Sequence, residues 1–394
     1  MIEYLAATVL GVAFGVFTGL VPGIHSNTVV FVSMPFYFRY SPSLMAYMSF
    51  IAAVSVAHTF HDFLPSIFFG LAEAETALAA LPGPRMAAQG RGLEAFARTV
   101  SGGLYTVTGF LVLAPVLFLV VEPLYGFLST YMFYILVFFL GFAVFRSENM
   151  FASVTIVALS GLLGVLTFNS NVNQSYALMP VFSGLFSAPA IVKGISNELN
   201  LPEQRKNLET DFDLPGVSTG FLSGLAAGLL PGIGSAISTS FFSPLIEEEN
   251  QFLTAMGAVN TADIFFSFVA LMMIGKSRSG ASVALNYLSS FNYAQAVFLI
   301  GVSVFAAGLS GFTVFRVAKY FLKVVDGFKF AHILSATGLT VLGVSFYLTG
   351  VLGILILLTS SMIGYAASIK GERKSCMAVL IVPAMKFYAT GLIV

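Results

Sequence analysis

Three ionisable side chains, His58, His61 and Asp62, lie within a long apolar stretch of residues 44–69. An ionisable group at membrane depth is energetically costly and usually serves a function. His58 and His61 are three residues apart and share one helix face, where with Asp62 they could handle a substrate or relay a proton. A buried, hydrogen-bonded structural cluster is the competing interpretation. A zinc site is disfavoured because the glutamate of a His-Glu-x-x-His motif is missing.

A second polar group, Asn260, Thr261 and Asp263, interrupts the apolar stretch of residues 251–274. Its amide, hydroxyl and carboxylate oxygens suit Na⁺, and the carboxylate alone could carry a proton. We therefore predict that both polar groups bind or transfer a coupling ion. The competing interpretation for Asp263 is a structural ion pair with a basic residue further along the chain.

Two Pro-Gly steps mark candidate anion sites. Residues 19–27 read GLVPGIHSN and residues 228–236 read GLLPGIGSA, each inside an apolar run. Proline removes a backbone donor and glycine can adopt positive φ, so each step is predicted to break a helix. The helix that follows presents unpaired N–H groups, which favour an anion. The predicted substrate-binding residues are Pro22, Gly23, Ile24, His25, Ser26, Asn27 and Thr28, together with Pro231, Gly232, Ile233, Gly234 and Ser235. Packing kinks, with Ser and Thr bonded to their own helix, are the alternative.

Lys276 and Arg278 lie in a polar turn of residues 275–280. Such side chains bind carboxylates or phosphates through charge-assisted hydrogen bonds, so both are included among the predicted substrate-binding residues. A cytoplasmic anchor under the positive-inside rule explains them equally well. A further basic run is expected to form a solvated loop: Arg316, Lys319, Lys323 and Lys329.

The elements that must position these residues are membrane helices. Of the 394 residues, 57% are hydrophobic and only 9% are charged, against roughly 25% charged in ordinary globular domains. Long apolar runs recur along the chain, among them residues 99–121, 128–145 and 150–168. They predict an all-α polytopic membrane protein with about ten to twelve transmembrane helices. The net charge of zero gives no reason to expect nucleic acid, and the single Cys376 excludes an internal disulfide.

The two Pro-Gly stretches also predict an internal repeat. An offset of 209 residues aligns Pro22 with Pro231, and an offset of 205 aligns residues 54–60 with 259–265. The second alignment continues to the glycine that follows each helix. Two matched segments separated by a four-residue difference in loop length are hard to obtain by chance.

We interpret the chain as a first transmembrane repeat of residues 1–192, a hydrophilic linker of residues 193–214 and a second transmembrane repeat of residues 215–394. The charge that follows the two breaks differs in sign, Arg39 against Glu247 to Glu249. This difference favours inverted repeats with broken or re-entrant helices at the Pro-Gly motifs.

These residues resemble the large permease subunit of the tripartite tricarboxylate transporter family, especially its compact TctA-like archaeal and bacterial members. The resemblance is carried by residues 15–23 and 224–232, by residues 65–67 with 81–90 (LPGPRMAAQG), and by the small-residue run of 275–285. It implies a multi-pass carrier of small di- or tricarboxylates that is driven by an ion gradient. It also implies a small membrane subunit and an external binding protein as partners.

The favoured hypothesis is a secondary active transporter of a small organic anion in the cell membrane, coupled to Na⁺ or H⁺, with alternating access around the two Pro-Gly tips. We do not expect an enzyme, and we expect no cofactor, with Na⁺ as a candidate coupling ion. The alternative is a lipid-phosphate (polyprenyl phosphate) translocase of the same architecture, which a lateral opening beside the tips would favour. An intramembrane metal-dependent hydrolase is a remote alternative, and a homo-oligomer is left open.

Overall fold

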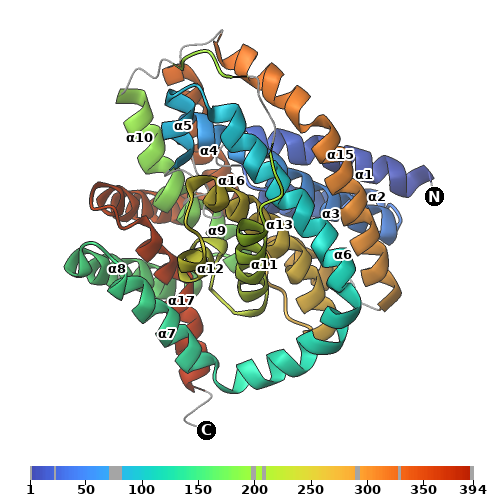
Figure 1. Ribbon diagram of the computed structural model, residues 1–394. Coiled ribbons are helices and arrows are strands. Elements are labelled where there is room, and N and C mark those ends of the chain that lie inside the picture. Colours follow the sequence, from blue (N-terminus) through green and yellow to red (C-terminus); the bar gives the residue numbers. More distant parts are fainter. Residues whose placement is uncertain are drawn as a thin grey trace.

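The computed structural model describes residues 2–21, 24–70, 82–196, 201–205, 210–288, 293–326 and 330–390, and within these ranges it contains helices and no strand (Figure 1). The predicted all-α class is confirmed. The helices of the first half are α1 (Ile2–Leu20), α2 (Ser26–Tyr40), α3 (Leu44–His61), α4 (Phe63–Phe69), α5 (Pro82–Ala88), α6 (Gly92–Thr130), α7 (Met132–Phe145), α8 (Met150–Phe168), α9 (Gln174–Phe182), a π-helical turn (Ser183–Ser187) and α10 (Ala188–Ser196). Those of the second half are α11 (Leu214–Leu229), α12 (Ser235–Phe242), a 3-10 turn (Ser243–Leu245), α13 (Glu249–Ile274), α14 (Gly280–Leu288), α15 (Tyr293–Asp326), α16 (Phe330–Ile369), a second 3-10 turn (Arg373–Met377) and α17 (Ala378–Thr390).

Eight helical segments of the described chain are long and apolar enough to cross a membrane. Helices satisfy their own backbone hydrogen bonds, which is what a lipid environment demands. Two shorter apolar helices, α7 and α11, accompany these eight. Helix α16 contains Gly350 with φ 63° and ψ −155°, which interrupts the helical path. The eight candidate spans of the described residues are fewer than the ten to twelve that the sequence predicts, and the polytopic membrane class is confirmed.

Local signals in the sequence set several helix ends. Asp213 accepts a hydrogen bond from the backbone of Gly216 at the start of α11. Glu248 and Gln251 form a capping box at the start of α13. Gly275, at φ 62°, ends the same helix in the left-handed conformation that glycine adopts most easily.

Glycines bring two pairs of helices into backbone contact. In the first half, a methyl group added at Gly15 of α1 would lie 2.5 Å from the carbonyl oxygen of Val54 in α3. In the second half, Gly224 of α11 lies directly against Ala262 of α13. In each pair the earlier helix carries glycines four residues apart along the contact. Helix α1 is therefore held close to α3, and α11 is held close to α13.

The two halves interlock. Helix α6 of the first half packs along α13 of the second, and α15 of the second half packs on α3 of the first. The same exchange recurs further on, where α8 packs against α17 and α10 against α16. The central helices α3 and α13 are therefore each covered by a long helix from the other half, and this arrangement buries nearly their whole length.

Buried apolar side chains form two main clusters. The larger cluster is built from α1 to α6, α10, α11 and α13 to α16. The smaller cluster is built from α7, α8, the π-helical turn, α16, α17 and the residues just before and after the second Pro-Gly step. In Figure 1, α7, α8 and α17 accordingly lie together to one side of the bundle that contains α3 and α13.

Two sequence expectations need correction. Arg316, Lys319 and Lys323 do not form a loop, because they lie in the last turns of the 34-residue helix α15. Lys329 lies outside the described residues. The sequence predicts a membrane helix over residues 99–121. In the structure, α6 continues through Pro115 and Pro123 to Thr130, so this helix extends beyond residue 121.

Candidate functional site

A buried polar contact joins the two predicted ion-coupling groups. The amide nitrogen of Asn260 in α13 donates a hydrogen bond of 2.9 Å to Oδ2 of Asp62, which lies between α3 and α4. The same nitrogen lies 3.5 Å from the carbonyl oxygen of Thr59. Asn260 and Asp62 are each only 3% exposed. Residues from different halves of the chain therefore form one polar core at the α3–α13 interface.

His58 extends this polar core toward α1. Its Nε2 lies 3.8 Å from Oδ2 of Asp62, a separation at which a protonated imidazole forms an ion pair. Its Nδ1 lies 3.0 Å from the hydroxyl oxygen of Thr18 in α1. The close approach of α1 to α3 at Gly15 is what brings this hydroxyl within reach. The carboxylate of Asp62 is thus contacted by a titratable donor on one side and by an amide on the other.

The first helix break lies directly beside the same core. His25 precedes α2, and its ring centroid is 4.8 Å from that of His58 in an edge-to-face arrangement. Its Nδ1 lies 3.3 Å from the hydroxyl oxygen of Ser26, the first residue of α2. Ile24 lies in the short segment before them. Pro22 and Gly23 fall outside the described residues, as do the side chains of Asn27 and Thr28.

Three further predicted residues lie on α3 and α13. His61 is fully buried, and its Nδ1 donates a 2.7 Å hydrogen bond to the carbonyl oxygen of Ala57 in its own helix. The Thr261 hydroxyl faces Gly103 of α6 and has no hydrogen-bond partner among the described residues. Asp263 is less buried than Asn260 one turn earlier on α13. His61 is thus hydrogen-bonded to its own helix through Nδ1.

The second helix break faces other elements. Helix α11 ends at Leu229 and α12 begins at Ser235, with Gly232 between them at φ 75°. A methyl group added at Gly232 would lie 2.9 Å from the carbonyl oxygen of Leu380 in α17, and Gly234 lies against Met377. Ile233 is buried in the smaller apolar cluster, and Pro231 is partly buried.

The first turn of α12 carries buried hydroxyl groups. Those of Ser235 and Thr239 have no hydrogen-bond partner among the described residues. The turn after α13 lies elsewhere again: Lys276 is exposed, and the guanidinium of Arg278 contacts Tyr125 of α6 at 3.2 Å. The predicted binding residues are therefore distributed over three places, namely the polar core with the first break, the second break, and this turn.

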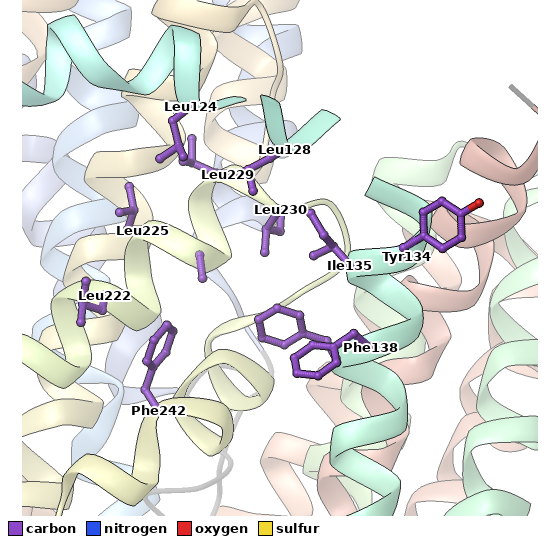
Figure 2. Close-up of a pocket in the computed structure, with 12 residues that line it drawn as sticks. Leu124, Leu128, Tyr134, Ile135, Phe138, Leu222, Leu225, Leu229, Leu230 and Phe242 are labelled. Carbon is purple, nitrogen blue, oxygen red and sulfur yellow. The ribbon is translucent and has the colours of Figure 1, made fainter. Parts of the chain in front are cut away.

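An apolar cleft of about 470 Å³ lies beside the second break. Figure 2 shows it between α11 and α12 on one side and α7 on the other, with the end of α6 above. Its wall is almost entirely carbon, and Phe138, Tyr134 and Leu222 at its margin are exposed on the protein surface. The lining residues are Leu124, Leu128, Tyr134, Ile135, Phe138, Phe139, Leu222, Leu225, Ala226, Leu229, Leu230 and Phe242. A cleft with such walls suits a hydrocarbon chain.

The described residues contain no group of three His, Cys, Asp or Glu side chains that could hold a metal ion.

Comparison with known proteins places this geometry in a family. The sequence model of the Tripartite tricarboxylate transporter TctA family matches residues 5–378. The chain belongs to the TctA family. The "Uncharacterized protein MJ1079" of Methanocaldococcus jannaschii is 27% identical over 399 residues, which cover 97% of this chain and 98% of that protein. No solved structure matches the chain.

Family membership settles the broad class. This TctA family protein is a transporter-like, multi-pass protein of the cell membrane, as the resemblance in the sequence implies. The TctA family is a family of transporters. Its members often belong to a tripartite system.

Sequence reasoning missed two contributors to these sites. Thr18 lies between Gly15 and Gly19 on the face of α1 that packs against α3, so the glycine spacing could have indicated it. Tyr125 has no comparable signal, because only the fold brings α6 to the turn that carries Arg278.

Proposed function

We propose that this TctA family protein is a secondary active carrier of a small organic anion of the di- or tricarboxylate class, coupled to H⁺ or Na⁺. The observation that carries the proposal is the buried hydrogen bond between Asn260 and Asp62, which unites polar groups from both halves beside the first helix break. Buried ionisable groups between membrane helices are typical of coupling sites.

The polar core has the parts that ion coupling needs. When Asp62 is ionised, it accepts from Asn260 and attracts a protonated His58 or a sodium ion. When it is protonated, the charge between α3 and α13 is removed. Because these two helices belong to different halves, the charge state of Asp62 can bias their relative position, which is how an ion gradient would drive alternating access.

We further propose that the halves are inverted repeats. In support, Gly15 contacts Ala57 while Gly224 contacts Ala262, so the two sequence offsets of 209 and 205 recur in the packing. The order of elements also recurs, from a helix and a break to a short helix, a long buried helix and a long covering helix. In such a carrier the substrate anion would lie at the first helix break, with His25 and Ser26 as its donors.

The test is uptake of labelled succinate and citrate by purified protein in proteoliposomes, under an imposed pH or Na⁺ gradient. Asn260→Leu should abolish gradient-driven uptake because it removes the donor to Asp62. Ser267→Ala, a buried change on the same helix, should retain it. Asp263→Asn tests the second-half carboxylate and is expected to lose ion dependence. Uptake by wild-type protein that ignores both gradients would contradict the coupled-carrier proposal.

The family's tripartite organisation suggests partners. We propose that a small membrane subunit and an external binding protein raise the rate of uptake and that they contribute no side chain to the polar core. Reconstitution of this chain alone should then give slow but gradient-dependent transport. A complete requirement for the partners would contradict this assignment.

One observation favours a second candidate, a polyprenyl-phosphate translocase. The apolar cleft lies next to the second break and reaches the surface of helices that face lipid, as a path for a hydrocarbon tail requires (Figure 2). Ala226→Phe would fill the cleft without altering the polar core. Loss of polyprenyl-phosphate movement with intact succinate uptake would assign the cleft to a lipid cargo, whereas unchanged behaviour toward both would remove this candidate.

A further inference from the structure

We propose that Arg278, Tyr125 and Tyr388 form a separate docking site for an oxyanion, either a carboxylate or a phosphate group. The site lies at the end of α13 and is distinct from the polar core around Asp62. Its assignment to the transported cargo rests on the proposed carrier function, whereas its ability to bind an oxyanion rests on the geometry alone.

Three elements converge on the guanidinium of Arg278. Its Nη2 donates to the hydroxyl oxygen of Tyr125 in α6 at 3.2 Å, and its central carbon lies 5.6 Å from the centroid of that ring. The side chain of Tyr388 in α17 lies beside both Tyr125 and Arg278. A planar guanidinium flanked by two phenol groups presents N–H and O–H donors to one point, which is the arrangement that an oxyanion requires.

The positive charge has no acidic partner among the described residues. The ion pairs found there involve other groups: His58 with Asp62, Arg85 with Glu249, and Arg91 with Glu94. Arg278 is partly buried, and its Nε is enclosed without a hydrogen-bond partner in the described part of the chain. An anion that binds beside a partly buried cation compensates its charge, so this guanidinium offers a place for an external oxyanion.

The loop that carries Arg278 is held by its own hydroxyl groups. Ser282 accepts hydrogen bonds from the backbone N–H groups of Arg278 and Ser279, both at 2.9 Å. The Ser277 hydroxyl donates to the carbonyl oxygen of Ser282 at 3.2 Å. These contacts fix the backbone and leave the guanidinium as the group directed at a ligand.

The position of the site suggests its role. From Asn260 to the end of α13 at Ile274 the helix rises about 20 Å, at about 1.5 Å per residue. Arg278 is therefore near one end of the membrane span, while Asp62 and Asn260 lie within it. A site in this position can hold an anionic cargo before or after the cargo reaches the polar core. The site also contacts helices of both apolar clusters.

The experiment measures thermal unfolding of purified protein in detergent with added succinate, citrate or inorganic phosphate, against sodium chloride at equal ionic strength. A ligand that binds only the folded protein raises its apparent stability. The wild type should be stabilised, and Arg278→Gln should require at least about tenfold more anion for the same shift, equivalent to about 1.4 kcal/mol. Lys319→Gln removes a positive charge from an exposed position on α15 and should behave as the wild type.

Further arms separate the possible results. If Arg278→Gln folds poorly, Tyr388→Phe provides the test, and it should also weaken the anion effect. In nanodiscs, phosphatidylglycerol that removes the succinate effect in wild-type protein would identify a lipid headgroup as the source of the same oxyanion chemistry. Equal stabilisation of wild type and Arg278→Gln, or equal loss in Lys319→Gln, would overturn the proposal. Wild-type protein that lacks uptake but retains Arg278-dependent binding would count against the carrier function and not against this site.

Discussion

The break between α1 and α2 and the break between α11 and α12 have similar sequences but face different surroundings. At the first break, His25 lies edge-on to His58, within the polar core that contains Asp62. At the second break, Gly232 and Gly234 pack against the region that leads into α17, beside an apolar cleft.

The aligned positions show how the two regions differ. Thr18 aligns with Ala227, His25 with Gly234, and Asp62 with Ser267. His61, which lies against Gly19, aligns with Phe266, which lies against Gly228. The backbone contact is thus kept, while at these four positions the second half has smaller or apolar side chains. His58 aligns with Asp263, so α13 also carries an ionisable group at the matching position. We infer that the first break provides the chemistry of coupling, and that the second break provides packing and a passage for apolar groups.

The largest predicted effect tests what the two regions share. Gly15→Leu and Gly224→Leu should each lower the free energy of unfolding by more than about 3 kcal/mol, because the added side chain meets backbone atoms or a buried alanine of the facing helix. Gly109→Leu is the matched control, since an added Cβ there has no neighbour within 4 Å. Thermal unfolding in detergent measures all three. Folded, stable Gly15→Leu protein would contradict the close packing of α1 on α3.

A smaller effect tests the structural role of the second break. Gly232→Ala should destabilise the protein by about 1–3 kcal/mol, because the residue has φ 75° and the new methyl group lies 2.9 Å from the carbonyl oxygen of Leu380. Substrate affinity of the folded fraction should be unchanged. A variant of normal stability with weakened substrate binding would place the chemistry at the second break instead.

The complementary change tests the first break. His25→Ala should raise the KM for the transported anion about tenfold, equivalent to about 1.4 kcal/mol, with little change in unfolding temperature, because the side chain is partly exposed and contacts His58 and Ser26. Gly234→Ala, at the aligned position, should leave the KM unchanged, whatever its effect on packing against Met377. Equal KM shifts in His25→Ala and Gly234→Ala would contradict the proposed difference between the two breaks.

The sequence predicted helices where one continuous apolar pattern is bounded by polar or Gly-Pro signals. The bounds of α1 and α8 match the apolar runs of residues 2–20 and 150–168. The pattern failed for α6, because Pro115 and Pro123 are accommodated within a single helix. The spacing of apolar residues indicates which residues are buried locally. It cannot show whether a helix continues past a proline.

The candidate site was predicted only in part. Composition identified His58, Asp62 and Asn260, because polar groups stand out in apolar helices. It could not show that Asp62 and Asn260 form one hydrogen bond, since they are 198 residues apart and meet only through the packing of α3 on α13. Nor could it separate His61 from His58, because only the fold shows which of the two is turned to its own backbone.

The central claim is that the charge of Asp62 couples an ion gradient to movement of the anion. Asp62→Asn tests it most directly, because asparagine can still accept the hydrogen bond from Asn260 but cannot ionise. In proteoliposomes the variant should exchange labelled for unlabelled succinate across the membrane yet lose accumulation driven by a pH or Na⁺ gradient. Ser267→Ala, at the aligned position, should retain both activities. Gradient-driven accumulation by Asp62→Asn at the wild-type level would contradict the account.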